Sequence, residues 1–220
     1  MKNHLKARAA PRTWNIPRKA EKFVTRPNPG SQKLEMTMPL GMLLRSLKIA
    51  STKKELNYII KNSSVLVNGK RRWDYNFGVG FLDIISLPET KQNYTLTMDK
   101  KGRLVAQHVD EKEAETKLTQ ARTISKISGN RLQLHLSDGR NIIVDKPLAS
   151  GTTVVVSIAD GKITKVLPVE TKASVMLIAG KHRGKRGVVE SITADMITVQ
   201  TETENISTKK SYAFVLGGSA

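Results

Sequence analysis

The 220-residue sequence predicts an α+β protein built from several small modules, and three observations indicate this class. Two apolar stripes with helical spacing lie between residues 40 and 60. Most of the remaining chain consists of short apolar runs separated by Asn-Gly and Asp-Gly turns, a pattern typical of antiparallel strands. The first 36 residues combine many cations with four prolines, which is typical of an extended arm. We therefore expect a basic arm (residues 1–36), a module of two helices and a β-hairpin (37–92), a central antiparallel β-rich barrel or sandwich (93–169) and a small C-terminal β-barrel (170–220).

The charge of the chain indicates a polyanionic partner. It contains 37 Lys and Arg against 19 Asp and Glu, for a formal net charge of +18 and a pI of about 10.2. Such a balance is typical of nucleic-acid-binding proteins, although membrane-surface proteins share it. No apolar run is long enough for a membrane span, and the first 30 residues lack the apolar core of a secretory signal. Without cysteine there is no disulfide, thiolate zinc site or cysteine nucleophile, so we expect a reducing, intracellular compartment.

The arm carries a large share of this charge, since residues 1–33 hold nine basic residues and one acid, Glu21. Its prolines prevent a long amphipathic helix, which disfavours membrane attachment. An extended basic segment suits a polyanionic groove because its cations neutralise phosphates. Trp14 and Phe23 each have two interpretations, a buried hydrophobic anchor, which we favour, and stacking on an exposed base. The arm residues predicted to contact nucleic acid are Lys2, Lys6, Arg8, Arg12, Trp14, Arg18, Lys19, Lys22 and Arg26.

The next module contains two predicted helices and a basic hairpin. Leucines at i, i+3, i+4 and i+7 give residues 40–47 one apolar face, and Thr52 with Glu55 forms a capping box for the second helix. Asn68-Gly69 predicts a tight turn. The turn either has no function of its own or serves to aim the cations that follow it. The residues of this module predicted to contact nucleic acid are Arg45, Lys48, Lys53, Lys54, Lys61, Asn68, Gly69, Lys70, Arg71 and Arg72.

The central segment predicts a series of hairpins. Its turns are expected at Lys101-Gly102, Gly129-Asn130, Asp138-Gly139 and Asp160-Gly161. The acidic stretch at residues 110–117 is interpreted as a solvated helix or loop, because no histidine or second acidic cluster lies at ligand spacing. His108 and His135 are interpreted as ordinary surface or core histidines. We therefore expect no metal site and no catalytic site here.

The C-terminal segment predicts a strand, a basic glycine-rich loop, and two further strands within residues 173–201. Gly180, Gly184 and Gly187 would let the loop turn tightly and bring backbone N–H groups near a phosphate. The loop lacks the G-x-x-x-x-G-K-[ST] order of nucleoside triphosphate sites, and no helix follows it. Its residues predicted to contact nucleic acid are Lys181, His182, Arg183, Lys185, Arg186 and Gly187.

Several local strings resemble known RNA-binding families. LRSLKIASTKKELNYIIKNSSVLVNGKRR resembles the αL RNA-binding domain of ribosomal proteins, pseudouridine synthases and tyrosyl-tRNA synthetases. In that family the V-x-V-N-G turn, here Val65 to Gly69, and the helix before it form the RNA-binding face. The string VMLIAGKHRGKRGVV resembles the KOW motif of ribosomal proteins and transcription elongation factors, with Gly187 at the family's characteristic glycine.

The order of these modules resembles one family over essentially the whole chain. HLKARAAPRTW, RPNPGSQKLEMTMPL, SDGRNI and GKHRGKRGVV are similar to stretches of the e-type small-subunit ribosomal protein four family of archaea and eukaryotes. The length and the less basic middle suggest an archaeal form. The resemblance implies a monomer in the cytoplasmic ribosome that binds the 5′ region of small-subunit ribosomal RNA, beside neighbouring small-subunit proteins. It implies no catalysis, cofactor, metal, membrane or small-molecule substrate.

Two other classes remain as alternatives at this point. An RNA-modifying enzyme would use the αL-like module to hold RNA, but it needs a nucleophile or general base in a pocket. Residues 90–220 contain no cysteine and only His108, His135 and His182, with acids mostly in solvated runs. A transcription elongation factor would explain the KOW-like unit and leave the αL-like module without a role.

Overall fold

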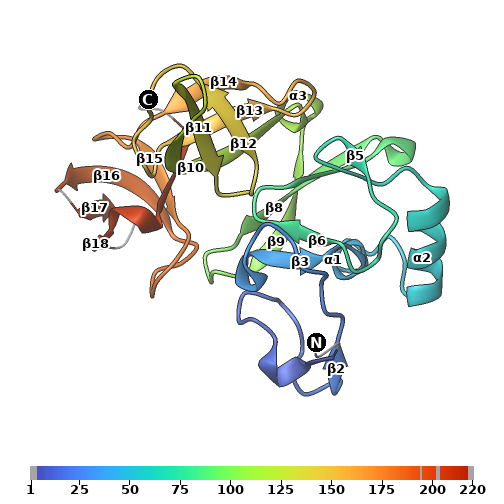
Figure 1. Cartoon of the computed structure of the whole chain (residues 1–220). Helices are drawn as coiled ribbons and strands as arrows, with labels where there is room; N and C mark the ends of the chain where they lie inside the picture. The colour runs from blue at the N-terminus through green and yellow to red at the C-terminus, as the bar shows by residue number, and fades with distance from the viewer. Residues whose placement is uncertain (1–3, 194, 202–203, 218–220) are drawn as a thin grey trace. The chain divides into compact units, whose positions relative to one another are not determined.

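The computed structural model describes residues 4–193, 195–201 and 204–217, and the chain forms two compact units (Figure 1). Unit 1 comprises residues 1–97 and 103–117, and unit 2 comprises residues 98–102 and 118–220. The described residues are mostly β, with few helices and several sheets, of which three have five strands. The predicted chain of mainly antiparallel modules is confirmed at this level. None of the helices in these ranges has the length and apolar character needed to cross a membrane.

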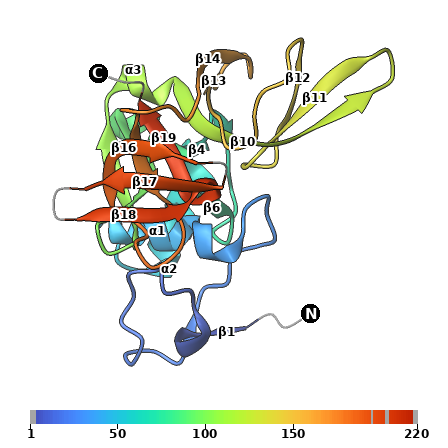
Figure 2. The same ribbon diagram turned by 90° about the vertical axis from the view of Figure 1, so that its left-hand side faces the viewer.

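The N-terminal segment of unit 1 folds back on itself. Strand β1 (Leu5–Lys6) pairs antiparallel with β2 (Phe23–Val24), and a 3-10 turn, η1 (Ala7–Ala9), follows β1; β2 is labelled in Figure 1 and β1 in Figure 2. Trp14 fastens this loop, because its side chain is 2% exposed and its Nε1 donates a hydrogen bond of 2.7 Å to the carbonyl oxygen of Thr37. A buried indole whose N–H has an acceptor is a stable anchor. The anchor interpretation of Trp14 is confirmed, and the extended arm is corrected to a pinned loop.

The predicted helix pair is confirmed. After η2 (Leu34–Met36) and β3 (Thr37–Pro39), α1 spans Leu40–Ser46 and α2 spans Lys53–Asn62. Leu40, Leu43 and Leu44 are fully buried, as the apolar stripe predicts. The capping box is complete, with the Glu55 amide donating to Thr52 Oγ1 and the Glu55 carboxylate accepting from the Thr52 amide. Such a cap contributes about 1 kcal/mol to helix stability.

The main sheet of unit 1 has the order β5-β4-β7-β8-β9, while β3 pairs separately with β6 (Gly78–Gly80). Its strands are β4 (Leu66–Val67), β5 (Lys70–Arg71), β7 (Ile84–Leu87), β8 (Gln92–Met98) and β9 (Leu104–Val109), with η3 (Pro88–Thr90) between β7 and β8. From the sequence we assigned β8 and β9 to the central β-rich segment. They extend the hairpin sheet instead, because Gln92 to Thr95 of β8 pair with β7 and β9 is the next strand of that sheet. The acidic stretch contains the short helix α3 (Glu111–Ala114), which has no buried residue, in agreement with its solvated interpretation, but the last residue of the stretch, Lys117, is buried in β10 (Thr116–Ile127).

A buried polar network holds the hairpin turn of unit 1. The Lys117 side chain is 2% exposed, and its Nζ lies 2.6 Å from Asp83 Oδ1. The same carboxylate accepts hydrogen bonds from Asn68 Nδ2 (2.9 Å) and from the amide of Gly80 (2.7 Å). Asn68 Oδ1 in turn accepts from the amide of Ile84 (3.0 Å). Satisfying a buried charge from several sides keeps its desolvation from destabilising the fold.

Unit 2 contains two five-stranded sheets. The first has the order β12-β11-β10-β13-β14, formed by β10 (Thr116–Ile127), β11 (Arg131–Leu136), β12 (Asn141–Val144), β13 (Thr153–Ser157) and β14 (Ile163–Leu167). The second has the order β18-β17-β16-β15-β19, formed by β15 (Ser174–Leu177), β16 (Arg186–Ile192), β17 (Met196–Gln200), β18 (Asn205–Lys209) and β19 (Ala213–Gly217), with η4 (Lys210–Tyr212) before β19. Figure 2 shows β16, β17 and β18 side by side. The two sheets meet where Gln120 Nε2 donates to the carbonyl oxygen of Ala213 (3.0 Å).

Glycines allow the predicted turns and one close crossing in unit 2. Gly129, Gly139 and Gly161 have positive φ angles, as the hairpin predictions require. Gly184, with φ of 87°, crosses the turn that contains Asp99 and leaves no room for a side chain. The basic loop is therefore held against that turn by a backbone contact.

Candidate nucleic-acid interface

The pinned N-terminal loop presents most of its predicted cations to solvent. Lys2 lies outside the described residues, whereas Lys6, Arg8, Arg12, Lys19, Lys22 and Arg26 are all exposed. Arg18 differs, because its guanidinium donates to the carbonyl oxygens of Arg8 (3.2 Å) and Pro11 (3.0 Å) and so closes the loop. Trp14 is also removed from the predicted contacts, since its buried ring offers no face to a base. Phe23 stays 46% exposed, with Lys22 Nζ 5.5 Å from its ring centroid.

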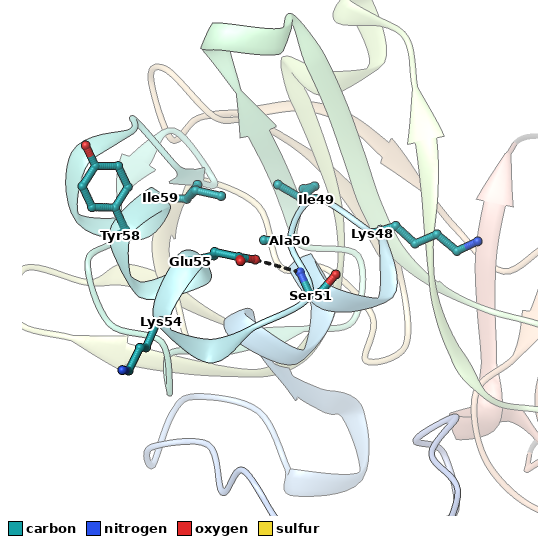
Figure 3. Close-up of a pocket in the computed structure, with 8 residues that line it drawn as sticks. All are labelled: Lys48, Ile49, Ala50, Ser51, Lys54, Glu55, Tyr58 and Ile59. Carbon is teal, nitrogen blue, oxygen red and sulfur yellow. Dashed lines mark hydrogen bonds between the residues drawn. The ribbon is translucent and has the colours of Figure 1, made fainter.

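The helix pair exposes all five predicted cations, namely Arg45, Lys48, Lys53, Lys54 and Lys61. Two of them, Lys48 and Lys54, line an open groove of about 710 Å³ where the α1–α2 connection meets α2 (Figure 3). The one acid in this groove, Glu55, accepts hydrogen bonds from the Ser51 and Thr52 amides at 3.2 Å. Because these backbone amides occupy the Glu55 carboxylate, the charges of Lys48 and Lys54 remain available to an anion.

Some of the predicted residues of the hairpin are exposed, and others support the fold. Gly69, Lys70 and Arg71 are exposed at the turn and on β5. Asn68 directs its amide toward Asp83, so its side chain supports the turn rather than meeting a partner. Arg72 is half-buried, and its guanidinium lies 4.3 Å from the centroid of the Phe77 ring, a cation–π distance. The turn therefore aims two of the three cations that follow it at solvent.

An acid from another part of unit 2, Glu204 just before β18, lies against the basic loop. Lys185 Nζ donates a hydrogen bond to Glu204 Oε1, and His182 Nδ1 lies 3.5 Å from the same oxygen. The hydrogen bond and positive charge of Lys185, helped by His182 and Lys181, lower the pKa of Glu204 below that of a free glutamate. The carboxylate therefore keeps its charge to a lower pH than a free glutamate does.

The other predicted residues of this loop have different surroundings. Lys181 and Arg186 are exposed, whereas Arg183 is half-buried and packs over Gly102. Gly187 lies in β16 rather than in the loop, paired with Val175. A side chain there would overlap the carbonyl oxygen of Gln200. Gly187 is thus needed for strand packing, and its contact with a phosphate stays a prediction.

Two exposed aromatic residues were not among the sequence predictions. Tyr58 on α2 is 70% exposed, and Trp73, just after β5, is 60% exposed. The Arg71 guanidinium carbon lies 5.4 Å from the Trp73 ring centroid. An aromatic residue directly after three successive cations is the signal in the sequence that could have identified Trp73. Within the described part of the chain, no group of three or more His, Asp or Glu side chains is arranged to hold a metal ion.

Comparisons with known proteins agree over most of the chain. The family model described as Ribosomal family S4e matches residues 90–163, and the RS4NT domain model matches residues 1–35. The chain is 36% identical over 201 residues to the small ribosomal subunit protein eS4 of Nanoarchaeum equitans, covering 89% of this chain and 85% of that protein. It is 35% identical over 224 residues to that of Dictyostelium discoideum, covering 98% of this chain and 84% of that protein.

A solved structure shares the fold. The crystal structure of the 30S ribosomal protein S4e from Thermoplasma acidophilum superposes with a TM-score of 0.73 at 29% sequence identity. The match covers 84% of this chain and 96% of that one.

Proposed function

The chain belongs to the ribosomal S4e family, and from this premise we propose that it is a structural constituent of the small ribosomal subunit that binds ribosomal RNA. The observation that carries the proposal is the extent of the match, since relatives called small ribosomal subunit protein eS4 align with up to 98% of this chain. The exposed cations of both units fit this role, because ribosomal RNA presents phosphates wherever it is approached. No catalytic step, metal or small-molecule substrate is part of the proposal.

We propose different roles for different parts of the chain. Residues 37–92 act as an αL-type RNA-binding module, and residues 170–220 act as a KOW unit. The pinned loop adds a third basic surface, so the chain would contact several helices in the 5′ region of the small-subunit RNA on the body of the particle. Neighbouring small-subunit proteins cover part of the remaining surface, and the protein is present as one copy in cytoplasmic ribosomes.

Sedimentation tests the ribosomal assignment directly. A native lysate is centrifuged through sucrose gradients at low and at high salt, and each fraction is probed for this chain. We expect co-migration with the small subunit that survives moderate salt, as for an integral component. A peak that sediments apart from ribosomes at both salt concentrations would contradict the proposal.

Neutral variants of the pinned loop should weaken the salt dependence of RNA binding. Lys6, Arg8 and Arg12 are exposed, so replacing all three with glutamine removes cations without disturbing the Trp14 anchor. Each lost phosphate contact lowers the slope of log K against log salt by roughly 0.7 to 0.9, which gives an expected decrease of about 2. Filter binding of a 5′-region RNA fragment from about 50 to 300 mM KCl measures the slope.

The matched control for that triple variant lies in unit 2. Lys162 and Lys165, on and before β14, are exposed and outside the predicted contacts, and their replacement by glutamine should leave the slope nearly unchanged. Equal slopes for the wild type and the loop variant would show that these cations of the pinned loop do not contact phosphates.

The Glu204→Gln variant should bind RNA more tightly than the wild type. Losing the carboxylate frees Lys185 and His182 for a phosphate and removes one repulsive charge. Exposed pairs of this kind contribute little, so we expect a gain of only about two- to fivefold at low salt. Glu170→Gln, which removes the same charge from an exposed position in unit 2, is the control. A gain of the same size in both variants would show a general charge effect only.

A further inference from the structure

Unit 1 carries two exposed rings that are connected through cations. Tyr58 and Trp73 are 70% and 60% exposed, although rings of this size usually bury most of their surface. Scattered apolar residues on a surface are common, and the exposure of each ring alone carries no argument. What matters here is that basic side chains connect the two rings to each other.

The connection follows from helix geometry and two contacts in the structure. Lys54, Tyr58 and Lys61 are spaced i, i+4 and i+7 on α2, and they share one helix face. Arg71 Nη2 donates to the carbonyl oxygen of Lys61 (3.2 Å), which brings the end of β5 to the C-terminal end of α2. The Arg71 guanidinium in turn lies beside the Trp73 ring. We call this set the aromatic–basic stripe; its members, all exposed, are Lys54, Tyr58, Lys61, Arg71 and Trp73.

The acids nearest to the stripe in sequence are used within the protein. The Glu55 carboxylate caps α2, and Figure 3 shows Lys54 and Tyr58 extending away from its hydrogen bond to Ser51. Asp74 Oδ1 accepts from the amide of Asn76 (2.9 Å), and its Oδ2 accepts from Asn28 Nδ2. The stripe therefore presents rings and cations together, which favours an anionic partner with exposed flat groups.

We propose that the aromatic–basic stripe binds an unpaired stretch of RNA, with bases stacked on Tyr58 and Trp73 and phosphates at Lys54, Lys61 and Arg71. This inference rests on the RNA-binding role proposed above and specifies the form of RNA recognised there. Bases in a duplex are already stacked on each other and leave no face for a side chain, so paired RNA would use the cations alone. Alternating rings and cations are the pattern by which proteins follow a single strand. A protein partner could cover the rings, but it would leave the three cations without matched phosphates.

Tryptophan fluorescence gives a direct measurement, because the chain has two tryptophans and Trp14 is buried. Quenching by a ten-residue oligoadenylate is compared with quenching by an abasic decamer that has the same phosphates and by a duplex of equal charge. Stacking should quench Trp73, and the Trp73→Phe variant should lose this signal while its Trp14 emission stays constant. We expect the oligoadenylate to bind at least about tenfold more tightly than the abasic strand, since stacking on one ring is worth about five- to a hundredfold.

Ring-removal variants separate this inference from the proposed function. Trp73→Leu and Tyr58→Leu should each weaken oligoadenylate binding at least fivefold and leave abasic and duplex binding unchanged. Ile143→Ala, which trims an apolar side chain that is 54% exposed in unit 2, should change none of the three affinities. Equal affinities for the oligoadenylate and the abasic strand, unaffected by either ring variant, would contradict base stacking on the aromatic–basic stripe. The protein would then bind RNA through its phosphates alone. Failure of all three nucleic acids to bind at low salt would overturn both the stripe and the proposed role.

Discussion

Replacing Gly184 with alanine is expected to destabilise unit 2 by about 2–5 kcal/mol. Two effects add at this position. The φ angle of 87° is unfavourable for any residue with a Cβ, at roughly 1–2 kcal/mol. The added Cβ would also overlap the carbonyl oxygen of Asp99 and lie 2.7 Å from the amide nitrogen of Gly102. Both neighbours are backbone atoms, so relief requires moving one of two packed turns, and overpacking of this kind costs about 1–3 kcal/mol more.

Urea unfolding followed by far-ultraviolet circular dichroism measures this effect, and Gly161→Ala is its matched control. Gly161 has a φ of 68° but open space around the position of a Cβ, so its substitution should cost only the backbone strain of about 1–2 kcal/mol. Equal losses of stability in the two variants would show that the close contact between the basic loop and the Asp99 turn adds nothing to the cost of the Gly184 substitution. The expected difference also explains why the loop carries a glycine between its cations.

Replacing Asp83 with asparagine is expected to destabilise unit 1 by about 3–5 kcal/mol. The substitution keeps the shape of the side chain and removes the charge that faces the buried Lys117 amine at 2.6 Å. Removing one partner of a buried ion pair leaves the other charge in a medium that solvates it poorly, which gives losses of this size. Tryptophan fluorescence during urea unfolding reports on this unit, because Trp14 and Trp73 both belong to it.

The double variant Asp83→Asn with Lys117→Met distinguishes charge from packing. Methionine fills a similar volume without a charge, and replacing a whole buried pair is often nearly neutral. We expect the double variant to recover at least half of the stability that Asp83→Asn loses. Additive losses from the two substitutions would mean that the pair contributes through packing alone.

Features that depend on neighbours in sequence were predicted correctly. The leucine stripe of α1, the Thr52–Glu55 capping box and the turns at Asn68-Gly69 and Asp138-Gly139 all follow from contacts within a few residues. The anchoring role of Trp14 was also predicted, because burying a large ring outweighs leaving it exposed.

Features that depend on distant partners were missed or misassigned. The place of β8 and β9 in the sheet of unit 1 depends on pairing with β7, which hydrophobic alternation alone does not specify. Arg18 and Arg72 were predicted to face a partner, yet Arg18 closes the N-terminal loop and Arg72 lies over Phe77. The sequence shows where a cation lies along the chain. It does not show which acceptors or rings the fold brings close to that cation.

Composition and local pattern by themselves determined that this chain is a basic protein of mainly antiparallel modules with a capped helix pair, since charge, periodicity and turn chemistry act over a few residues. Only the tertiary structure decided which cations stay exposed and which support the fold. It pairs Asp83 with Lys117 across 34 positions, sets Glu204 against Lys185 across 19, and brings Arg71 to the end of α2. The physical reason is that a hydrogen bond or ion pair needs atoms about 3 Å apart, and only chain folding brings residues so far apart in sequence to that distance.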